Sequence, residues 1–441
     1  MKIILIEPPN FQRSGTWEKQ KVYRTPTNLA ILAAYARQRG YNDIKIFDFD
    51  VHGGPAKALA EKIISEKPDI VGFTCLTPRF PAILAIASFV KQAAPQAVIV
   101  IGGPHVNGVK EKILNDAAID FGMIGEAETA FVELLDSIKS KSGLGGVHNL
   151  IYRTEGKVRI NPVFPAIQDL DSLPFPAWDL LDLNDYTDQA LYNGPHAGIM
   201  SGRGCPYSCI FCASKVTWGQ KVRLRSAENV VGEIVELIGK FGISEYMFYD
   251  DTFTINRKRA ADICRLIIEK NLKIRFYLQS RADTIDLELA QLLKTAGCIG
   301  VAIGVESGDE IILKQIGKCE TKDQFRKAVK IFKEVGLPCV ASYIIGLPGD
   351  THETIKATID FANELDTDQA KFMIATPYPG TALYDMAVER NLLKSDSIED
   401  LGDYTYYQHV AANLSFVKDE ELVAYQRSAY DEYDKRKRSL R

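Results

Sequence analysis

Residues Gly202–Ser214 read GRGCPYSCIFCAS and place three cysteines, Cys205, Cys209 and Cys212, close together with no fourth cysteine nearby. Three cysteines at this spacing indicate a metal centre rather than inert buried thiols. A structural zinc site normally takes four protein ligands, and His196 is the histidine that could complete such a set. Iron–sulfur clusters are also held by thiolates, normally four. Three thiolates would hold three irons of a cubane and leave the fourth iron open to a small chelating ligand.

The overall composition excludes several classes of protein. The chain has 441 residues, 46% of them apolar, so we expect two or three domains with real cores. A net charge of −4 gives no indication of a basic surface that would bind nucleic acid. The sequence has no apolar run that could span a bilayer, and the start, MKIILIEPPN, looks like a first strand rather than a signal peptide. We therefore expect a cytoplasmic protein without a disulfide framework or a transmembrane segment.

The first part of the chain alternates between strand-like and helix-like patterns. This alternation predicts a parallel sheet covered by helices on both faces, a Rossmann-like α/β domain over residues 1–140. The expected strands are Ile3–Ile6, Ile44–Phe47, Ile70–Phe73, Val98–Ile101 and Phe121–Ile124. Residues 141–195 are rich in Gly, Pro and Asp and contain a hairpin-like stretch, NLIYRTEGKVRI. We expect this segment to be a linker that Phe175 and Trp178 pin to a neighbouring domain.

The alternation returns over residues 196–385. Six strand–helix units predict a partial (β/α)6 barrel of the TIM type, with its chemistry in the loops that follow the strands. The expected strands are Gly198–Ser201, Tyr246–Tyr249, Ile274–Leu278, Gly300–Gly304, Cys339–Ile345 and Lys371–Ala375. Residues 386–441 form a C-terminal segment that ends in a solvated helix. Its stretch Gly402–Val410, GDYTYYQHV, either caps the barrel mouth over a substrate or packs in the ordinary way.

The Cys-x3-Cys-x2-Cys spacing after the first barrel strand resembles that of the radical S-adenosylmethionine (SAM) superfamily. The resemblance implies that Cys205, Cys209 and Cys212 hold a 4Fe–4S cluster whose open iron binds SAM, with Phe211 beside the adenine. It also implies SAM contacts where the next strands end. These candidates are Asp250, Asp251, Ser280, Arg281, Glu306, Ser307, Gly346 and Leu347. The superfamily often has a Gly-Gly-Glu segment after the second strand, and FYDDTFTIN here lacks its glycines, so the contact to the SAM amino group stays open.

The N-terminal part resembles cobalamin-binding Rossmann-like domains, which carry a Ser-x-Leu and Gly-Gly pattern. The resemblance implies that the ends of the third, fourth and fifth strands accept the corrinoid. The matching residues are Thr74, Leu76, Thr77, Gly102, Gly103, Pro104, Gly125 and Glu126. Many such domains have a cobalt-binding histidine after the first strand, and EPPNFQR has none. His52 follows the second strand instead, and we interpret it as a loop residue; without a ligand, the domain would be a flavodoxin-like scaffold.

Together, the two resemblances imply a cobalamin-dependent radical SAM enzyme of the methyltransferase kind. Such an enzyme cleaves SAM to a 5′-deoxyadenosyl radical, removes hydrogen from an unactivated carbon and transfers a methyl group to it. The expected partners are a small-molecule or lipid substrate and an electron donor such as flavodoxin or ferredoxin. Two alternatives stay open: radical cyclisation, ring rearrangement or C–C coupling without methyl transfer, and a non-enzymatic zinc-binding module. The sequence identifies no catalytic side chain and does not choose the substrate.

Overall fold

The structure is a computed structural model that describes residues 1–9, 24–188, 191–395 and 409–439. It divides into two compact units. The first contains the described residues up to Asp188, and the second contains most of the described residues from Leu191 onward. No helix of the described residues is both long enough and apolar enough to cross a bilayer.

The first unit is built on a seven-stranded sheet in the order β2-β1-β3-β4-β5-β6-β7. The strands β1 to β5 are parallel, and β6 and β7 add to β5 in antiparallel fashion. All five strands expected in this part of the chain are present. The strand bounds are β1 Ile3–Glu7, β2 Ile44–Asp48, β3 Ile70–Thr74, β4 Val98–Gly102, β5 Phe121–Met123, β6 Leu150–Thr154 and β7 Lys157–Ile160.

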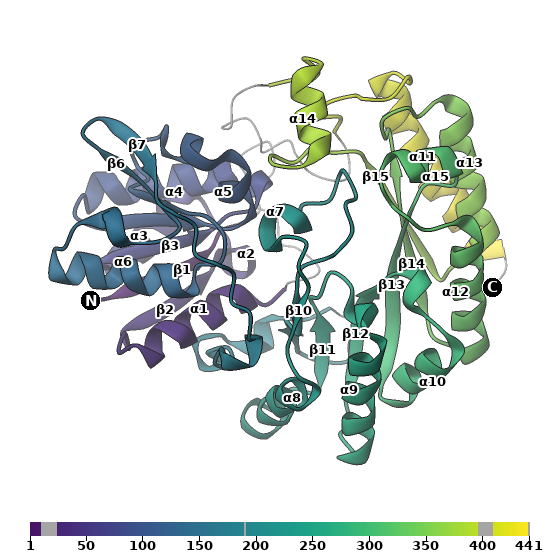
Figure 1. Ribbon diagram of the computed structural model, residues 1–441, viewed down its shortest axis with the longest axis horizontal. Helices are drawn as coiled ribbons and strands as arrows, with labels where there is room; N and C mark the ends of the chain where they lie inside the picture. The colour runs from purple at the N-terminus through teal and green to yellow at the C-terminus, as the bar shows by residue number, and fades with distance from the viewer. Residues whose placement is uncertain (10–23, 189–190, 396–408, 440–441) are drawn as a thin grey trace. The chain divides into compact units, whose positions relative to one another are not determined.

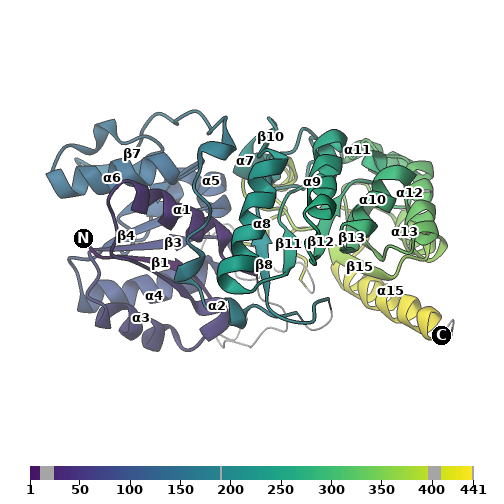
Figure 2. The ribbon, with the colours of Figure 1, turned by 90° about the horizontal axis from the view of Figure 1, so that it is seen from below.

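Helices cover both faces of this sheet, as expected for parallel strands whose two sides are apolar. One core lies between the sheet and α3 and α4, and a second core lies between the sheet and α1 and α6. Figure 2 shows these two pairs on opposite sides of the strands. The helix bounds are α1 Thr27–Gln38, α2 Phe49–His52, α3 Ala56–Ser65, α4 Phe80–Ala93, α5 Pro104–Val109 and α6 Glu128–Ser140.

The structure divides the chain differently from the expected linker over residues 141–195. The hairpin of β6 and β7 is present, and Glu155 (φ 51°) and Gly156 (φ 72°) form its two-residue turn. These strands extend the sheet of the first unit, and the amide of Ala177 donates to the carbonyl of Ala30 in α1 at 3.0 Å. All four residues of β7 are exposed, and β7 lies at the edge of the sheet.

The second unit is the predicted partial (β/α)6 barrel, which is called the half-barrel below. Its six strands are parallel, in the order β15-β14-β13-β12-β11-β8, and the edge strands β8 and β15 are not paired with each other. Figure 1 shows α8, α9, α10, α12 and α13 along one side of this sheet. The strand bounds are β8 His196–Ile199, β11 Glu245–Phe248, β12 Arg275–Ser280, β13 Cys298–Glu306, β14 Cys339–Ile345 and β15 Gln369–Ile374. The helix bounds are α8 Ala227–Phe241, α9 Arg257–Glu269, α10 Leu287–Thr295, α11 Glu310–Gln315, α12 Lys322–Val335, α13 His352–Leu365 and α14 Ala382–Glu389.

The C-terminal helix α15, Asp419–Ser439, is more than the solvated end that its charges predict. It lies along the edge strand β15 and buries Leu422, Ala429 and Tyr433. Its Gln426 side chain donates to the carbonyl of Phe372 at 2.9 Å, and its Tyr430 hydroxyl accepts from the amide of Phe372 at 3.0 Å. Most of the stretch Gly402–Val410, considered as a cap, lies outside the described residues.

Candidate functional site

The three clustered cysteines lie in a loop between β9 (Gly202–Arg203) and α7 (Ser214–Trp218), after the carboxyl end of β8. All three are free thiols with intermediate exposure. The loop begins at Gly204, whose φ is +94° and where a Cβ would lie 2.5 Å from the carbonyl oxygen of Lys221. Only glycine fits that approach, so the close contact with the Lys221 backbone fixes the start of the loop.

The donor set fits an iron–sulfur cluster. Burial raises the pKa of Cys209 to about 11 and that of Cys212 to about 12, so the thiols are neutral until a metal displaces their protons. Among the described residues, no three His, Cys, Asp or Glu side chains converge closely enough to hold a single metal ion. Thiolates that each bind a different iron of a cubane stand further apart than the ligands of one zinc ion.

His196, the histidine considered as a fourth zinc ligand, is not available to the loop. It is 1% exposed in β8, and its ring stacks on Tyr192 with centroids 4.6 Å apart. Phe211, the expected adenine neighbour, lies half-buried in the turn between Cys209 and Cys212.

The two aspartates after β11 are anchored to the segments on either side of the cysteine loop. Asp250 accepts from the amide of Ser201 at 2.7 Å and from its hydroxyl at 2.6 Å. Asp251 accepts from the hydroxyl of Ser214, the first residue of α7. Burial raises the pKa of Asp250, and Arg259 opposes that shift. Both carboxylates are therefore engaged in holding the loop, a use that the strand-end position alone does not reveal.

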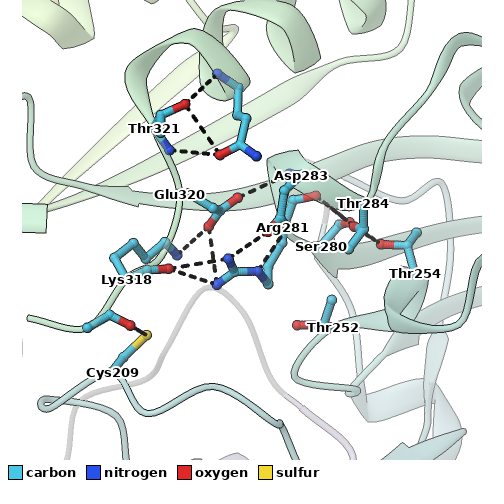
Figure 3. A network of polar contacts seen from close by, with 12 residues as sticks. Cys209, Thr252, Thr254, Ser280, Arg281, Asp283, Thr284, Lys318, Glu320 and Thr321 are labelled. Atoms are coloured by element: carbon cyan, nitrogen blue, oxygen red, sulfur yellow. Dashed lines mark hydrogen bonds and ion pairs between the residues drawn. The ribbon is translucent and has the colours of Figure 1, made fainter. Parts of the chain in front are cut away.

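Arg281 after β12 belongs to a buried network of charges (Figure 3). Its guanidinium donates to both carboxylate oxygens of Asp283, at 3.0 and 2.8 Å, and lies 3.3 Å from a carboxylate oxygen of Glu320. Lys318 lies 3.2 Å from the same Glu320 carboxylate and 3.4 Å from that of Glu306. Nothing in the sequence singled out Lys318 and Glu320, because they stand in a turn between two helices and match no motif.

The other candidates after β12 and β13 are also engaged within the protein. Ser280 is buried and shares hydroxyl hydrogen bonds with Thr254 and Thr284. Burial raises the pKa of Glu306, and Lys318 opposes that shift. The Ser307 hydroxyl is fully buried against the Thr358 hydroxyl at 3.2 Å.

The glycine turn after β14 contacts two side chains of the same chain, Asp350 and Leu422. The amides of Gly346 and Leu347 donate to one carboxylate oxygen of Asp350, at 3.0 and 2.9 Å. Gly346 has a φ of +85°, and a Cβ there would lie 3.1 Å from Leu422 of α15. The backbone of Gly346 therefore lies close to a leucine of the same chain. Asp350, whose pKa burial raises to about 6, was not among the candidate residues.

At the carboxyl edge of the first unit, the ends of β3 and β4 are joined. The amide of Cys75 donates to the Gly102 carbonyl at 2.7 Å, and the amide of His105 donates to the Cys75 carbonyl at 3.1 Å. A Cβ on Gly103 (φ +104°) would lie 2.9 Å from the Cys75 nitrogen, so this approach requires glycine. Pro104 then begins α5.

In the Thr74–Thr77 stretch, the two threonine hydroxyls have partners within the protein, whereas the leucine side chain is exposed. The Thr74 hydroxyl accepts from Asn28 at 3.0 Å, and the Thr77 hydroxyl lies 3.2 Å from Nδ1 of His105. Leu76 between them is 44% exposed, an apolar side chain presented at the edge where ligands bind in open α/β sheets.

His105 is a residue that sequence reasoning missed. It is 1% exposed, packs on the ring of Phe80, and its Nε2 has no hydrogen-bond partner among the described residues. Burial lowers its pKa to about 4, so the ring is neutral. A buried polar atom without a partner is uncommon in native proteins, and this atom at the carboxyl edge fits a domain that accepts a polar cofactor.

The neighbouring glycine turn holds Gly125 and Glu126. The Gly125 amide donates to Asn107 at 2.7 Å, and the Glu126 carboxylate accepts from the Ile167 amide at 3.1 Å. His52 is the last residue of the short helix α2 and not a loop residue as expected, and its Nε2 lies 3.1 Å from Asp185.

A second missed group is a cluster of carboxylates where β1 and β2 end. Glu7 and Asp50 both pair with Arg79, and Asp48 accepts from the Tyr186 hydroxyl at 2.8 Å. Burial raises the pKa of both Glu7 and Asp48. Two carboxylates thus share one buried guanidinium, with Asp48 near them, a grouping that only the parallel strand order brings together.

The fold and the site together are those of a radical SAM barrel joined in one chain to a Rossmann-like domain. Residues 199–362 match the radical SAM superfamily, and residues 20–135 match the B12 binding domain. The radical SAM methyltransferase TsrM of Kitasatospora setae, solved with cobalamin and a 4Fe–4S cluster, has the same fold. It matches with a TM-score of 0.72 at 20% identity, over 88% of this chain and 75% of that one.

Two relatives are similar in sequence over most of the chain. An uncharacterized methyltransferase of Pyrococcus horikoshii is 39% identical over 394 residues, which are 89% of this chain and 84% of that protein. An anaerobic magnesium-protoporphyrin IX monomethyl ester cyclase of Rubrivivax gelatinosus is 29% identical over 87% of this chain and 69% of that protein. The chain belongs to the family of cobalamin-dependent radical SAM enzymes.

Its cofactors are those of the family: a 4Fe–4S cluster, SAM and cobalamin. The zinc-binding module considered as an alternative is therefore wrong. Among the residues that the structure describes, no three His, Cys, Asp or Glu side chains converge on one position, as the ligands of a zinc tetrahedron do.

Proposed function

We propose that this enzyme transfers a methyl group to an unactivated carbon of a small molecule or lipid. The observation that carries the proposal is the pairing of a three-thiol loop with a B12 binding domain in one chain. When bound, the cluster with SAM supplies a carbon-centred radical and the corrinoid supplies a methyl carrier. The P. horikoshii relative is named as a methyltransferase, which supports methyl transfer.

The half-barrel has three tasks in this proposal. Cys205, Cys209 and Cys212 hold the cluster and leave one iron for SAM. Phe211 lines the adenine site. The remaining SAM site is built around the strand-end residues Asp250, Asp251, Ser280, Arg281, Glu306, Ser307, Gly346 and Leu347, either by direct contact or by holding the loops that make it.

The Rossmann-like domain holds cobalamin in this proposal. Leu76 supplies apolar contact. Gly102 and Gly103 let the ends of β3 and β4 meet at the edge that receives the corrinoid, and Thr74 and Thr77 line the same edge. Pro104, Gly125 and Glu126 complete the contact set. The enzyme lowers the barrier mainly by orienting its cofactors and keeping water from the radical.

The proposal extends to partners and location. The cluster needs a one-electron donor, for which a flavodoxin or ferredoxin is the expected class. A cytoplasmic location fits the free thiols of the chain, because reducing compartments keep thiols from pairing.

Radical chemistry without methyl transfer is the second candidate, and the similarity to a cyclase favours it. The two candidates leave different products. Methyl transfer consumes SAM to S-adenosylhomocysteine as well as 5′-deoxyadenosine, whereas cyclisation or C–C coupling yields 5′-deoxyadenosine alone.

The deciding experiment is an anaerobic incubation of the enzyme, loaded with iron, sulfide and hydroxocobalamin, with SAM and a strong reductant. Chromatography of the nucleosides should give S-adenosylhomocysteine at about the amount of bound cobalt, and a cobalt-free sample should give none. 5′-Deoxyadenosine without S-adenosylhomocysteine in the cobalt-loaded sample would overturn methyl transfer.

A further inference from the structure

The ring of Tyr207 connects the cysteine loop to the buried charge network of the half-barrel. Tyr207 stands between Cys205 and Cys209, and the guanidinium carbon of Arg281 lies 3.5 Å from the centroid of its ring. A guanidinium stacks well on an aromatic face because it is planar and weakly hydrated. The attraction strengthens when the pair is shielded from water, and Arg281 is only 4% exposed.

Arg281 is itself held rigidly. Both carboxylate oxygens of Asp283 accept from it, and two of its nitrogens lie 3.3 Å from the carbonyl oxygen of Lys318. Figure 3 shows the guanidinium enclosed by Asp283, Glu320 and Lys318. A bidentate pair of this kind fixes the orientation of the guanidinium as well as stabilising its charge. The guanidinium therefore presents one face to Tyr207.

The segment Ile316–Glu320, which contains the Lys318 and Glu320 partners of Arg281, also contacts the cysteine loop directly. The amide of Ile210 donates to the carbonyl of Ile316 at 3.0 Å, and the Cys209 thiol lies 3.7 Å from the carbonyl oxygen of Gly317. A Cβ on Gly317 (φ +69°) would lie 2.9 Å from the Ser208 carbonyl oxygen, so the two backbones are in close contact. The segment Ile316–Glu320 therefore receives both the arginine and the loop.

We propose that Arg281 is a positioning residue that orders the cysteine loop through the ring of Tyr207. The loop between β9 and α7 has almost no regular structure to hold it, and its three thiols must face one cluster. The stack on Tyr207 and the backbone contacts at Ile210 and Cys209 fix the loop on both sides of Cys209. This inference rests on the proposed role of the three cysteines as cluster ligands.

The competing role for Arg281 is a direct ion pair with the SAM carboxylate. Its Nε and both terminal nitrogens are already directed at Asp283, Glu320 and the Lys318 carbonyl. A SAM carboxylate would have to displace at least one of these buried partners, which would leave that partner uncompensated. The two roles predict different effects of removing the Tyr207 ring. An arginine that orders the loop needs the ring, whereas an arginine that binds SAM directly does not.

The test compares Tyr207→Leu, Tyr207→Phe, Arg281→Met and the Tyr207→Leu/Arg281→Met double variant with the wild-type full chain. Each protein is reconstituted anaerobically with iron and sulfide. Three quantities are measured: the rate of iron loss to a chelator, the EPR spectrum of the reduced cluster with and without SAM, and the affinity for SAM. Lys322→Met is the matched control, because it removes a cation lying 4.6 Å from the Phe361 ring elsewhere in this unit.

Tyr207→Leu and Arg281→Met should each lose iron roughly tenfold faster than wild type, and the double variant should lose it no faster than either. Tyr207→Phe keeps the aromatic face and should match wild type, as should Lys322→Met. Tyr207→Leu removes no buried charge, so it stays informative if Arg281→Met fails to fold.

Three results would overturn the inference. They are wild-type iron retention in Tyr207→Leu, additive effects in the double variant, and an Arg281→Met variant that keeps its iron but no longer responds to SAM in EPR. If the wild-type chain itself loads no iron, the proposed function fails instead, so the two failures are distinguishable.

Discussion

In the proposed function, three single residues, Cys205, Cys209 and Cys212, supply the protein ligands of the redox centre. Each thiolate would bind a different iron, so none can substitute for another. Cys319, by contrast, is exposed and lies outside the loop. The chain thus offers its own control for the loss of a thiol.

Cys209→Ala should abolish the cluster, because two thiolates leave two irons without a protein ligand. Iron per chain after anaerobic reconstitution and 5′-deoxyadenosine formed from SAM are the measurements. Cys319→Ala should keep both at the wild-type level. SAM cleavage that persists in Cys209→Ala would contradict the assignment of the loop.

Glu7 makes the stability of the first unit depend on pH. Burial raises its pKa from 4.5 to about 8. Between these values the folded chain binds a proton that the unfolded chain has released, so the free energy of unfolding falls as pH rises and levels off above about pH 8. The stabilising contribution of the protonated group is thus present at low pH and lost at high pH.

Glu7→Gln should remove this slope. From about pH 6 to about pH 9, the variant should gain roughly 1–3 kcal/mol of unfolding free energy relative to wild type. Urea unfolding curves at several pH values measure the difference, with the exposed Glu61→Gln of α3 as the control. A difference between Glu7→Gln and wild type that stays constant with pH would contradict the raised pKa.

The sequence predicts residues that belong to a spaced motif, and it misses residues whose role depends on distant partners. The thiol spacing indicates a cluster from thirteen consecutive letters. Arg281 carries no sign in the sequence that Asp283, Glu320 and Tyr207 surround it. His105 likewise looks like any helix residue until the strand order buries its Nε2.

At the scale of elements, α15 completes the half-barrel by covering the open edge of β15. A parallel edge strand exposes unpaired backbone groups. Here the Gln426 side chain donates to the carbonyl of Phe372, and the Tyr430 hydroxyl accepts from its amide. The charges of α15 suggested a solvated helix, because the few positions that pack on β15 give only a weak period. All six barrel strands were predictable, since each is a short apolar run followed by a helix.

Gln426→Leu should destabilise the second unit by about 1–3 kcal/mol, because it leaves the buried Phe372 carbonyl without its partner. Tyr425→Phe is the matched control: its hydroxyl lies on an exposed part of the same helix, 3.0 Å from His352, and its loss should change stability by under about 0.5 kcal/mol. Chemical unfolding followed by circular dichroism measures both. Equal effects would mean that α15 does not protect the edge.

At the scale of the whole molecule, the two proposed cofactor sites lie on two compact units and should load independently. Leu76→Glu places a charge at the exposed apolar position of the proposed corrinoid edge. Cobalt retained after incubation with hydroxocobalamin should fall roughly tenfold or more, while iron stays at the wild-type level. Leu287→Glu, an exposed leucine of α10, should change neither; unchanged cobalt in Leu76→Glu would remove this edge from the proposed site.

The most direct test of the central claim is a metal count on the wild-type chain. The protein is reconstituted anaerobically with iron and sulfide, incubated with hydroxocobalamin, desalted, and analysed for iron and cobalt. An enzyme that pairs a three-thiolate cluster with a corrinoid should hold about four irons and about one cobalt per chain. Iron without cobalt would contradict the account of the Rossmann-like domain and, with it, methyl transfer.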